Sequence, residues 1–365
     1  MIPSTGLDES PGDGALLSTG GPRNGRLTVV MPTRNHAPYI RRALDSLVAQ
    51  IRRPDRILVL DDASTDETPS ILRAYAERYD FISVVTHEQN RGTVPRMHEG
   101  LATVESEYVL FMSSDDFIDI TLCAKSLDLM DRNPQAAFCL VQVIEVDEQS
   151  RYMGRSRTAS VSRSARFLEP RSVVRELTRH GSSFGGVGTI YRTALLRAAG
   201  GFDERLQSFA DGYVTELLGA KHGACVIPEY LAFWRRIDSS YYSTTIRDPA
   251  RVLTILEGTL QRMACPDRAF FSAEYRHRLE YRLRFVAAAA AARNRPIDRL
   301  LLRRAIAGRG GPMVEWTVLV GSAASRALGK LALFVVLRPW DILPVTLARF
   351  MAVVRRDRPA PIPFG

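Results

Sequence analysis

Short apolar runs rich in β-branched residues alternate with segments of helical spacing through the first third of the chain. The predicted strands are residues 27–32, 56–60, 81–85 and 108–112, and the predicted helices between them are residues 38–50, 66–79 and 93–103. Strands that alternate with helices in this way are typical of a mainly parallel α/β sheet flanked by helices. Residues 248–308 also show helical character, which predicts a helical C-terminal region. Because 45% of the residues are apolar, the chain can bury a full core, which excludes disorder of the whole chain.

Polar and acidic residues follow three of the predicted strands. The first strand runs into Pro32-Thr33-Arg34-Asn35, the second into Asp61-Asp62 and the fourth into Asp115-Asp116. Parallel α/β sheets bind ligands at the carboxyl ends of their strands. The sequence therefore predicts a ligand site at this edge of the sheet.

Two common phosphate-binding motifs are absent from the sequence. No GxGxxG follows the first strand and no GxxxxGK[ST] occurs, so neither a dinucleotide fingerprint nor a P-loop is supported. A divalent cation held by carboxylates is another way to bind phosphate, and Mg²⁺ or Mn²⁺ prefers such oxygen ligands. Asp115-Asp116 could hold this cation, or Asp116 could only cap the helix that follows it. Asp61-Asp62 could accept the N–H of a pyrimidine base, or could belong to a turn.

Five motifs, in their order along the chain, resemble those of glycosyltransferase family 2. They are VVMPTRNHAPYIRRALDSLVAQ, ILVLDDASTDET, Asn90-Arg91-Gly92, YVLFMSSDD, and IYRTALLRAAGGFD with the later Asp211-Gly212-Tyr213. The resemblance covers roughly residues 27–240. It implies the GT-A fold, a Rossmann-like, mainly parallel sheet flanked by helices, and a reaction that transfers a sugar from a nucleotide with inversion.

The resemblance also implies roles for residues on the donor side. The nucleoside pocket is expected to include Pro32, Thr33, Arg34 and Asn35, and Asp61 is expected to read the base, usually uracil.

Further roles concern the metal, the diphosphate and the acceptor. Asp115 and Asp116 match the family's motif for Mn²⁺ or Mg²⁺, with Asp116 as the more direct ligand. Arg235 is expected to face the diphosphate, and Arg96 to replace part of an Arg-Asn pair that this chain lacks. Asp211 matches the catalytic base, although the sequence alone is equally compatible with a helix N-cap.

A glycine-rich segment lies ahead of Asp211. Phe184, Gly185, Gly186 and Val187 are predicted to line the acceptor side, because glycine lets a ligand approach the backbone closely. The alternative is a loop that only needs positive φ.

Positive charge is concentrated toward the C-terminal end of the sequence. The whole net charge of +9 falls in residues 293–365, which hold thirteen basic and four acidic residues. This distribution favours an anionic surface as the partner and argues against nucleic acid. Apolar runs mixed with Arg and Lys in residues 312–356 predict a basic amphipathic tail on a membrane surface, or else a helical hairpin packed on the catalytic domain.

We expect three regions along the chain. They are a flexible leader at 1–25, a GT-A catalytic domain at 26–240 and a helical C-terminal region with the basic tail at 241–365. Within the catalytic domain, residues 26–118 form the predicted nucleotide-sugar half and residues 119–240 the acceptor half. Four scattered cysteines, no secretory signal and no spanning segment fit a cytoplasmic protein, peripheral on the inner face of the membrane.

The leading hypothesis is an inverting, metal-dependent glycosyltransferase. It would move a sugar from a nucleotide-sugar donor, with UDP as the expected nucleotide, to a saccharide or lipid-linked acceptor in cell-surface or exopolysaccharide assembly. A sugar nucleotidyltransferase is the alternative enzyme, but it is expected to have a Gly-rich, Arg-containing loop after the first strand, which residues 32–35 do not provide. A degenerate, non-catalytic scaffold at the membrane is the third hypothesis, and the presence of Asp116 and Asp211 argues against it.

Overall fold

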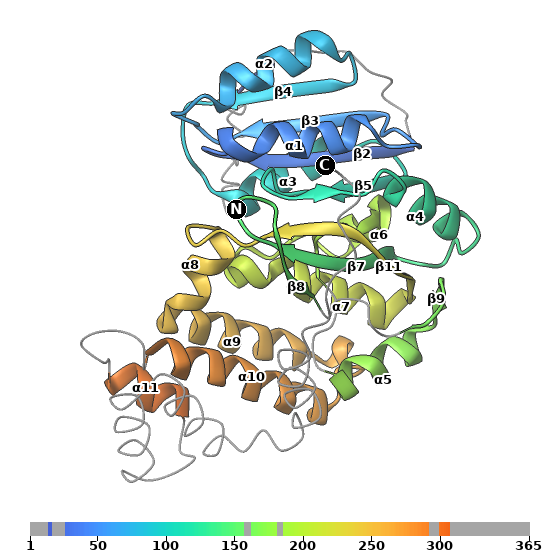
Figure 1. Cartoon of the computed structure of the whole chain (residues 1–365). Coiled ribbons are helices and arrows are strands. Elements are labelled where there is room, and N and C mark those ends of the chain that lie inside the picture. The colour runs from blue at the N-terminus through green and yellow to red at the C-terminus, as the bar shows by residue number, and fades with distance from the viewer. Residues whose placement is uncertain (1–13, 17–25, 157–161, 181–184, 292–298, 307–365) are drawn as a thin grey trace, which may run out of the picture.

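One mixed β-sheet forms the centre of the computed structural model, which describes residues 14–16, 26–156, 162–180, 185–291 and 299–306 (Figure 1). Its strands are β1 (Gly14–Leu16), β2 (Leu27–Thr33), β3 (Arg56–Asp61), β4 (Ile82–His87), β5 (Tyr108–Phe111), β6 (Phe117–Ile118), β7 (Phe138–Val146), β8 (Tyr152–Arg155), β9 (Arg166–Leu168), β10 (Ile190–Arg192) and β11 (Ala224–Arg235). The main path of neighbours is β1-β4-β3-β2-β5-β10-β7-β11-β6, while β8 pairs with β7 and β9 with β11.

The pairing is parallel in the part of the sheet that the sequence predicted. Strand β2 pairs in parallel with β3 and β5, and β3 pairs in parallel with β4. Strand β10 is antiparallel to both β5 and β7, and β7 and β11 are again parallel. These pairings confirm a mainly parallel α/β sheet and bring the ends of β2, β3 and β5 to one edge.

Helices cover both faces of this sheet. Those of the described residues are α1 (Ala37–Val48), α2 (Thr68–Arg78), α3 (Thr93–Thr103), α4 (Leu122–Asp131), α5 (Pro170–His180), α6 (Thr193–Ala198), α7 (Ala210–His222), α8 (Tyr241–Arg247), α9 (Pro249–Met263), α10 (Ala273–Ala291) and α11 (Arg299–Ile306). The first three lie where the sequence predicted helices. Helices α1 and α2 have a proline at one of their first two positions, where the missing N–H costs no helical hydrogen bond.

Strand β2 shows how the sheet is buried on both faces. Val29 and Met31 belong to a cluster that includes Ile40 and Leu44 of α1, whereas Val30 belongs to a second cluster that includes Leu101 of α3. Successive side chains of a strand point to opposite faces, so both faces need apolar residues. This explains why residues 27–31 read as an almost continuous apolar run.

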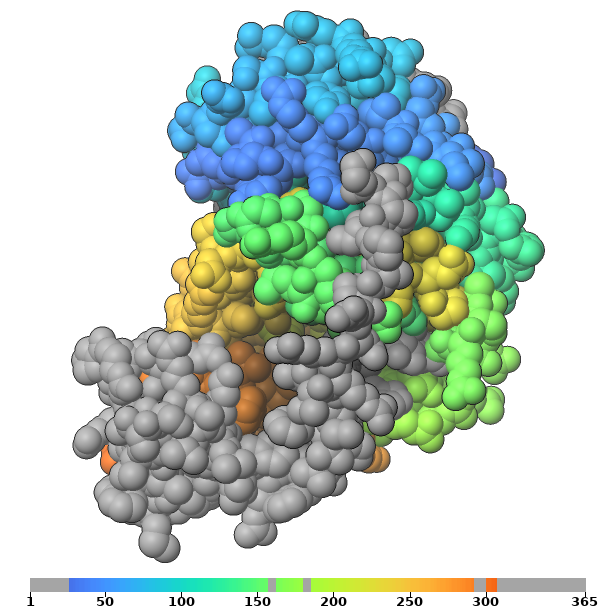
Figure 2. All heavy atoms as spheres, in the orientation of Figure 1, coloured from blue at the N-terminus to red at the C-terminus, as the bar shows by residue number. Residues whose placement is uncertain are grey.

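The C-terminal helices pack on the same core as the sheet. Helices α9 and α10 contribute Val252, Leu256 and Leu279 to the cluster that also holds Val214 and Leu218 of α7. The Tyr275 hydroxyl of α10 donates a 2.5 Å hydrogen bond to Glu216 of α7, and both side chains are buried. In the space-filling view, the blue and teal N-terminal segments lie directly against the green and yellow segments that follow them (Figure 2).

Several predicted segments fall wholly or largely outside the described residues. These are the basic tail at 312–356 and most of the leader at 1–25, within which β1 pairs antiparallel with β4. In the part of the chain that the structure describes, no helix combines the length and the apolar character needed to cross a bilayer.

Candidate active site

A cleft of about 1930 Å³ opens where β2, β3 and β5 end. The predicted site residues that line it are Pro32, Thr33, Arg34, Asn35, Asp115, Asp116, Gly185, Gly186, Val187 and Asp211. Asp61, Arg96 and Arg235 do not line it, and Phe184 lies outside the described residues. Ligand pockets commonly measure roughly 300–1,000 Å³, so this cleft has room for two substrates side by side.

The turns after β2 and β3 are tied to each other. The Asn35 amide donates a 2.9 Å hydrogen bond to Ser64 Oγ, and Asn35 Oδ1 accepts one of 2.8 Å from the Thr65 amide. Asn35 has a φ of 52°, which asparagine tolerates better than most residues, and Ala63 has a φ of 60°. Backbone strain of this kind gathers at ligand sites, where the surrounding contacts hold it.

The acidic pair after β3 divides between the core and the cleft. Asp61 is fully buried, its Oδ1 accepts a 3.2 Å hydrogen bond from the Ser64 amide, and its Oδ2 has no partner among the described residues. Burial raises the pKa of Asp61. Asp62, in contrast, lines the cleft. Asp61 therefore lies behind the cleft wall, and Asp62 is the member of this pair that lines the cleft.

The Asp62 carboxylate fixes a turn in the wall of the cleft. It accepts hydrogen bonds from the amides of Arg91 (2.9 Å) and Gly92 (2.7 Å) and from Arg96 Nε (2.7 Å). Burial alone would raise the pKa of Asp62, but these donors outweigh it and hold that pKa below its usual value. Arg96 also binds Glu99 at 2.7 Å, and only 3% of its side chain is exposed, so it supports the turn from behind instead of facing the cleft.

The two aspartates after β5 form a buried acidic pair on the cleft wall. Asp116 Oδ1 accepts a 2.8 Å hydrogen bond from the Arg235 amide, and Ser113 Oγ donates one to Asp115 Oδ1. Burial, followed by the negative charge of Asp115, raises the pKa of Asp116 well above its usual value. A bound cation would offset both the cost of burying the charge and the repulsion between the two carboxylates. The pair is therefore chemically suited to a divalent metal.

The pair would not complete a metal's coordination by itself. Among the described residues, no group of three or more His, Cys, Asp and Glu side chains is arranged to hold an ion. Mg²⁺ is commonly bound by one or two carboxylates together with substrate phosphates. The acidic pair therefore fits a metal that arrives with a diphosphate.

Arg235 has a different place from the predicted one. Its Nε donates to the Asp115 carbonyl at 2.9 Å, and its Nη1 donates to the carbonyls of Asp147 (3.0 Å) and Glu148 (2.8 Å). The residue is only 2% exposed, so its guanidinium holds the backbone of the acidic pair and does not face a diphosphate. Arg236 lines the cleft instead, with its guanidinium 4.2 Å from the centre of the Trp234 ring.

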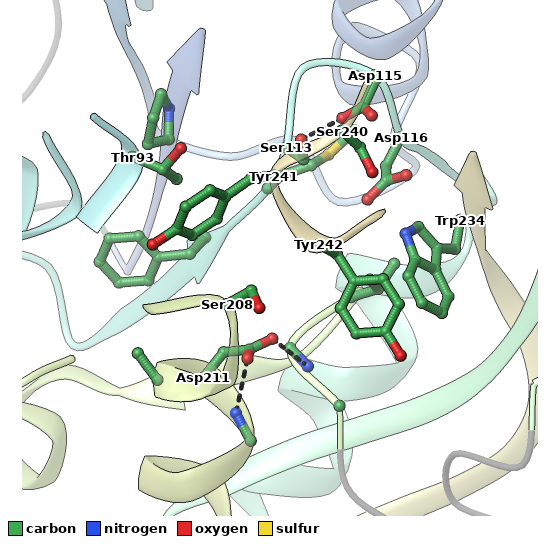
Figure 3. A pocket seen from close by; sticks show the side chains of 18 of the residues that line it. Thr93, Ser113, Asp115, Asp116, Ser208, Asp211, Trp234, Ser240, Tyr241 and Tyr242 are labelled. Atoms are coloured by element: carbon green, nitrogen blue, oxygen red, sulfur yellow. Dashed lines mark hydrogen bonds between the residues drawn. The ribbon is translucent and has the colours of Figure 1, made fainter. Parts of the chain in front are cut away.

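Asp211 lies in the first turn of α7, on the opposite side of the cleft from the acidic pair (Figure 3). Its Oδ1 accepts a 2.7 Å hydrogen bond from the Gly212 amide and its Oδ2 one of 3.1 Å from the Gly186 amide. Burial raises the pKa of Asp211, which these two amides oppose in part. The rings of Tyr241 and Tyr242 border the space between Asp211 and the acidic pair (Figure 3).

Sequence reasoning missed five of the cleft residues described above. Asp62 and Arg236 each directly follow the residue that was predicted, and alternation along a strand end was the signal that could have separated the neighbours. The aromatic wall was also missed; it consists of Trp234 near the end of β11 and of Tyr241 and Tyr242 at the start of α8.

Comparisons with known proteins find a family match in the N-terminal half of the chain. Residues 28–197 match the family model described as Glycosyl transferase family 2. An uncharacterized protein of Mycobacterium tuberculosis is 32% identical over 126 residues, which are 33% of this chain and 36% of the relative. The poly(ribitol-phosphate) beta-glucosyltransferase of Bacillus spizizenii is 34% identical over 97 residues, 26% of this chain and 15% of the relative. The chain thus spans about a third or less of the length of these curated relatives.

A solved structure supports the fold over nearly the whole chain. The mannosyltransferase PcManGT of Pyrobaculum calidifontis, in complex with GDP-Man and Mn²⁺, has a TM-score of 0.52 and 19% identity. The match covers 96% of this chain and 92% of that one. The match therefore extends beyond residue 197, into the region of the C-terminal helices.

Proposed function

Since residues 28–197 match the model of glycosyltransferase family 2, we propose that this protein transfers a sugar from a nucleoside-diphosphate donor to an acceptor hydroxyl, with inversion. The observation that carries the proposal is one cleft that holds Asp115 and Asp116 on one wall and Asp211 on the other. An inverting displacement needs this separation, because the leaving group departs on one face of the sugar while the acceptor attacks the other.

Asp211 is the proposed general base. Its carboxylate takes the acceptor hydroxyl proton as the acceptor oxygen bonds to the anomeric carbon and the bond to the diphosphate oxygen breaks. The amides of Gly186 and Gly212 fix the orientation of this carboxylate, and its raised pKa makes it a stronger base than an ordinary aspartate. General base catalysis typically contributes about 10²–10⁴ in rate.

Asp115 and Asp116 are the proposed ligands of a divalent cation, Mn²⁺ or Mg²⁺. When bound, such an ion offsets the charge that develops on the leaving nucleoside diphosphate. Arg236 is a second source of positive charge in the same cleft. Its guanidinium stacks on Trp234 and its Nε lies 3.9 Å from Oε2 of Glu145, and we propose that its other N–H groups bind the diphosphate.

The nucleoside is proposed to lie against the turns after β2 and β3. Arg34 and Asn35 are exposed there, and Asp62 with the Asn90–Gly92 turn lines the same wall. We propose a UDP-sugar as the donor on the basis of the family resemblance. The mannosyltransferase that shares the fold was solved with GDP-Man, so GDP-sugars form the second arm of the test.

The acceptor is proposed to be a saccharide or a lipid-linked saccharide in cell-surface glycan assembly. Support comes from the relative named as a poly(ribitol-phosphate) beta-glucosyltransferase. The basic C-terminal sequence supports peripheral binding to the inner face of the membrane, where a lipid-linked acceptor would be found.

A panel of nucleotide sugars tests the function. The full chain is incubated with UDP- and GDP-sugars and Mn²⁺ or Mg²⁺, and release of nucleoside diphosphate is measured with and without a chelator. We expect chelator-sensitive release that Asp116→Ala abolishes and that Asp128→Ala, at an exposed carboxylate on α4, leaves unchanged. Release that ignores both the chelator and Asp116→Ala would contradict the metal assignment, and no release from any donor would contradict the enzyme.

A further inference from the structure

His87 is a buried side chain that the proposed mechanism does not use. It is the last residue of β4, and only 1% of its side chain is exposed. Its Nδ1 lies 3.0 Å from the backbone carbonyl oxygen of Asp61, and its Nε2 lies 2.8 Å from Oε1 of Glu99 on α3. Each ring nitrogen therefore faces an oxygen, and the ring is almost completely shielded from solvent.

The two oxygens determine how many protons the ring carries. A backbone carbonyl can only accept a hydrogen bond, and an ionised carboxylate can only accept as well. A neutral imidazole has one N–H and would leave its second nitrogen lone pair pointing at an oxygen lone pair. An imidazolium ion, with two N–H groups, satisfies both partners.

The remaining alternative is a protonated Glu99 that donates to a neutral ring. Glu99 Oε2 accepts a 2.7 Å hydrogen bond from Arg96 Nη1, and 35% of the Glu99 side chain is exposed. A guanidinium partner and access to solvent both favour the ionised carboxylate. The second proton therefore belongs on His87.

We propose that His87 is a buried imidazolium ion that positions the nucleotide-binding wall of the cleft. It joins the Asp61 backbone to Glu99, and the chain of contacts continues through Arg96 to the Asp62 carboxylate. Asp62 in turn holds the amides of Arg91 and Gly92 at the cleft. His87 thus acts on the donor through other residues and is a positioning residue.

The charges around His87 agree with a positive ring. Asp61 on β3, Asp62 after it and Glu99 on α3 place three carboxyl groups near the ring, and Arg96 contacts two of them. Loss of a positive charge at His87 would remove one cation from beside these groups, behind a proposed site for an anionic ligand.

The protonation state can be measured directly in the full chain. Histidines are labelled with ¹⁵N, and the six ring systems are compared with those of His87→Gln to assign the His87 signals at neutral pH. We expect both His87 nitrogens to show the chemical shift of protonated nitrogens. A signal typical of an unprotonated ring nitrogen would overturn the proposal. Glu99→Gln, which removes the adjacent negative charge, should move His87 toward the neutral form, and an unchanged spectrum would also contradict it.

The positioning role rests on the proposed function and is tested by binding. We expect His87→Gln to weaken UDP or GDP binding, measured by calorimetry with Mn²⁺, by about tenfold, the effect of one charge-assisted hydrogen bond. The kcat at saturating donor should change less than twofold. His277→Gln, at an exposed histidine of α10 outside the cleft, should change neither. Unchanged binding in His87→Gln, or an equal loss in kcat, contradicts the positioning role.

The two proposals fail in different ways. If neither UDP nor GDP binds the wild-type chain, the proposed function is contradicted. If the nucleotide binds and His87 is neutral, only the inference about His87 is contradicted. Should His87→Gln not fold, Glu99→Gln gives the same comparison, because it removes the negative charge that links His87 to Arg96 and supplies an amide that can donate to a neutral ring.

Discussion

The amide of Gly186 donates a 3.1 Å hydrogen bond to Oδ2 of Asp211, which lies 25 residues further along the chain. A Cβ atom at Gly186 would clash with this carboxylate oxygen, because it would come closer than the 3.0 Å that real Cβ contacts keep. The glycine-rich segment was predicted to bring the backbone close to an acceptor. The structure shows that Gly186 brings the backbone close to the proposed base.

Gly186→Ala is expected to displace the Asp211 carboxylate and to lower kcat by at least tenfold, because a small misplacement of a catalytic group is costly. Steady-state release of nucleoside diphosphate measures this effect. Gly154→Ala is the matched control, since Gly154 lines the same cleft but has nothing within 4 Å of an added Cβ. Equal kcat values for the two variants would contradict a positioning role for Gly186.

Asp211→Asn should lower kcat by about 10²–10⁴ while the KM for the donor stays the same, because the amide cannot take a proton. Steady-state kinetics at pH 7.5 with donor and acceptor varied in turn measure both constants, and an unchanged kcat would contradict the assignment of Asp211 as the base.

The raised pKa of Asp211 predicts the acid limb of the rate profile. Since Asp211 must be ionised to accept a proton, kcat should fall as the pH drops through a pKa above that of an ordinary aspartate. A profile of kcat against pH, with the metal saturating throughout, measures this limb. An acid limb at the value of an unperturbed carboxyl would argue against Asp211 as the base.

Mn²⁺ together with UDP or GDP should raise the Tm of the wild-type chain, and Asp116→Asn should abolish the contribution of the metal. A ligand at 100 times its Kd stabilises a folded protein by about 2.7 kcal/mol, which is readily visible in an unfolding curve. Without ligands, Asp116→Asn should not be less stable than wild type, because burial and Asp115 already disfavour the ionised form. A metal effect that survives in Asp116→Asn would place the metal elsewhere.

Arg235 and Arg236 are adjacent in sequence but should differ in their effects. Arg235→Ala removes a buried guanidinium with hydrogen bonds to three backbone carbonyls, and we expect it to destabilise the fold by about 3–5 kcal/mol. Arg236→Ala should change stability little and raise the KM for the donor about tenfold, since it removes one charged contact to phosphate. Denaturant unfolding and donor titration separate the two. The reverse pattern would restore the original prediction for Arg235.

The sequence was sufficient for the α/β core because each strand and helix there has its own local signal. Residues 56–60 form an apolar run bounded by charged residues, and they occupy β3 as predicted. The acidic residues after these strands were also identified as a group. Their shared edge follows from parallel pairing, which the alternation of strands and helices already indicates.

The direction of single side chains at the cleft could not be predicted in the same way. Asp61 pairs with both Thr33 and Thr86 as the last residue of β3, and this register turns its carboxylate into the core while Asp62 reaches the cleft. Neighbouring strands determine that register. The contact of Gly186 with Asp211 and the carbonyls around Arg235 likewise join segments far apart in the chain, for which the sequence has no local signal.

The anomeric configuration of the transferred sugar tests the central claim most directly. The best donor from the panel is turned over with Mn²⁺, and ¹H NMR records the anomeric coupling of the first product before mutarotation. A single displacement across the cleft, with Asp211 as base, predicts a configuration opposite to that of the donor. A product that retains the donor's configuration would contradict it.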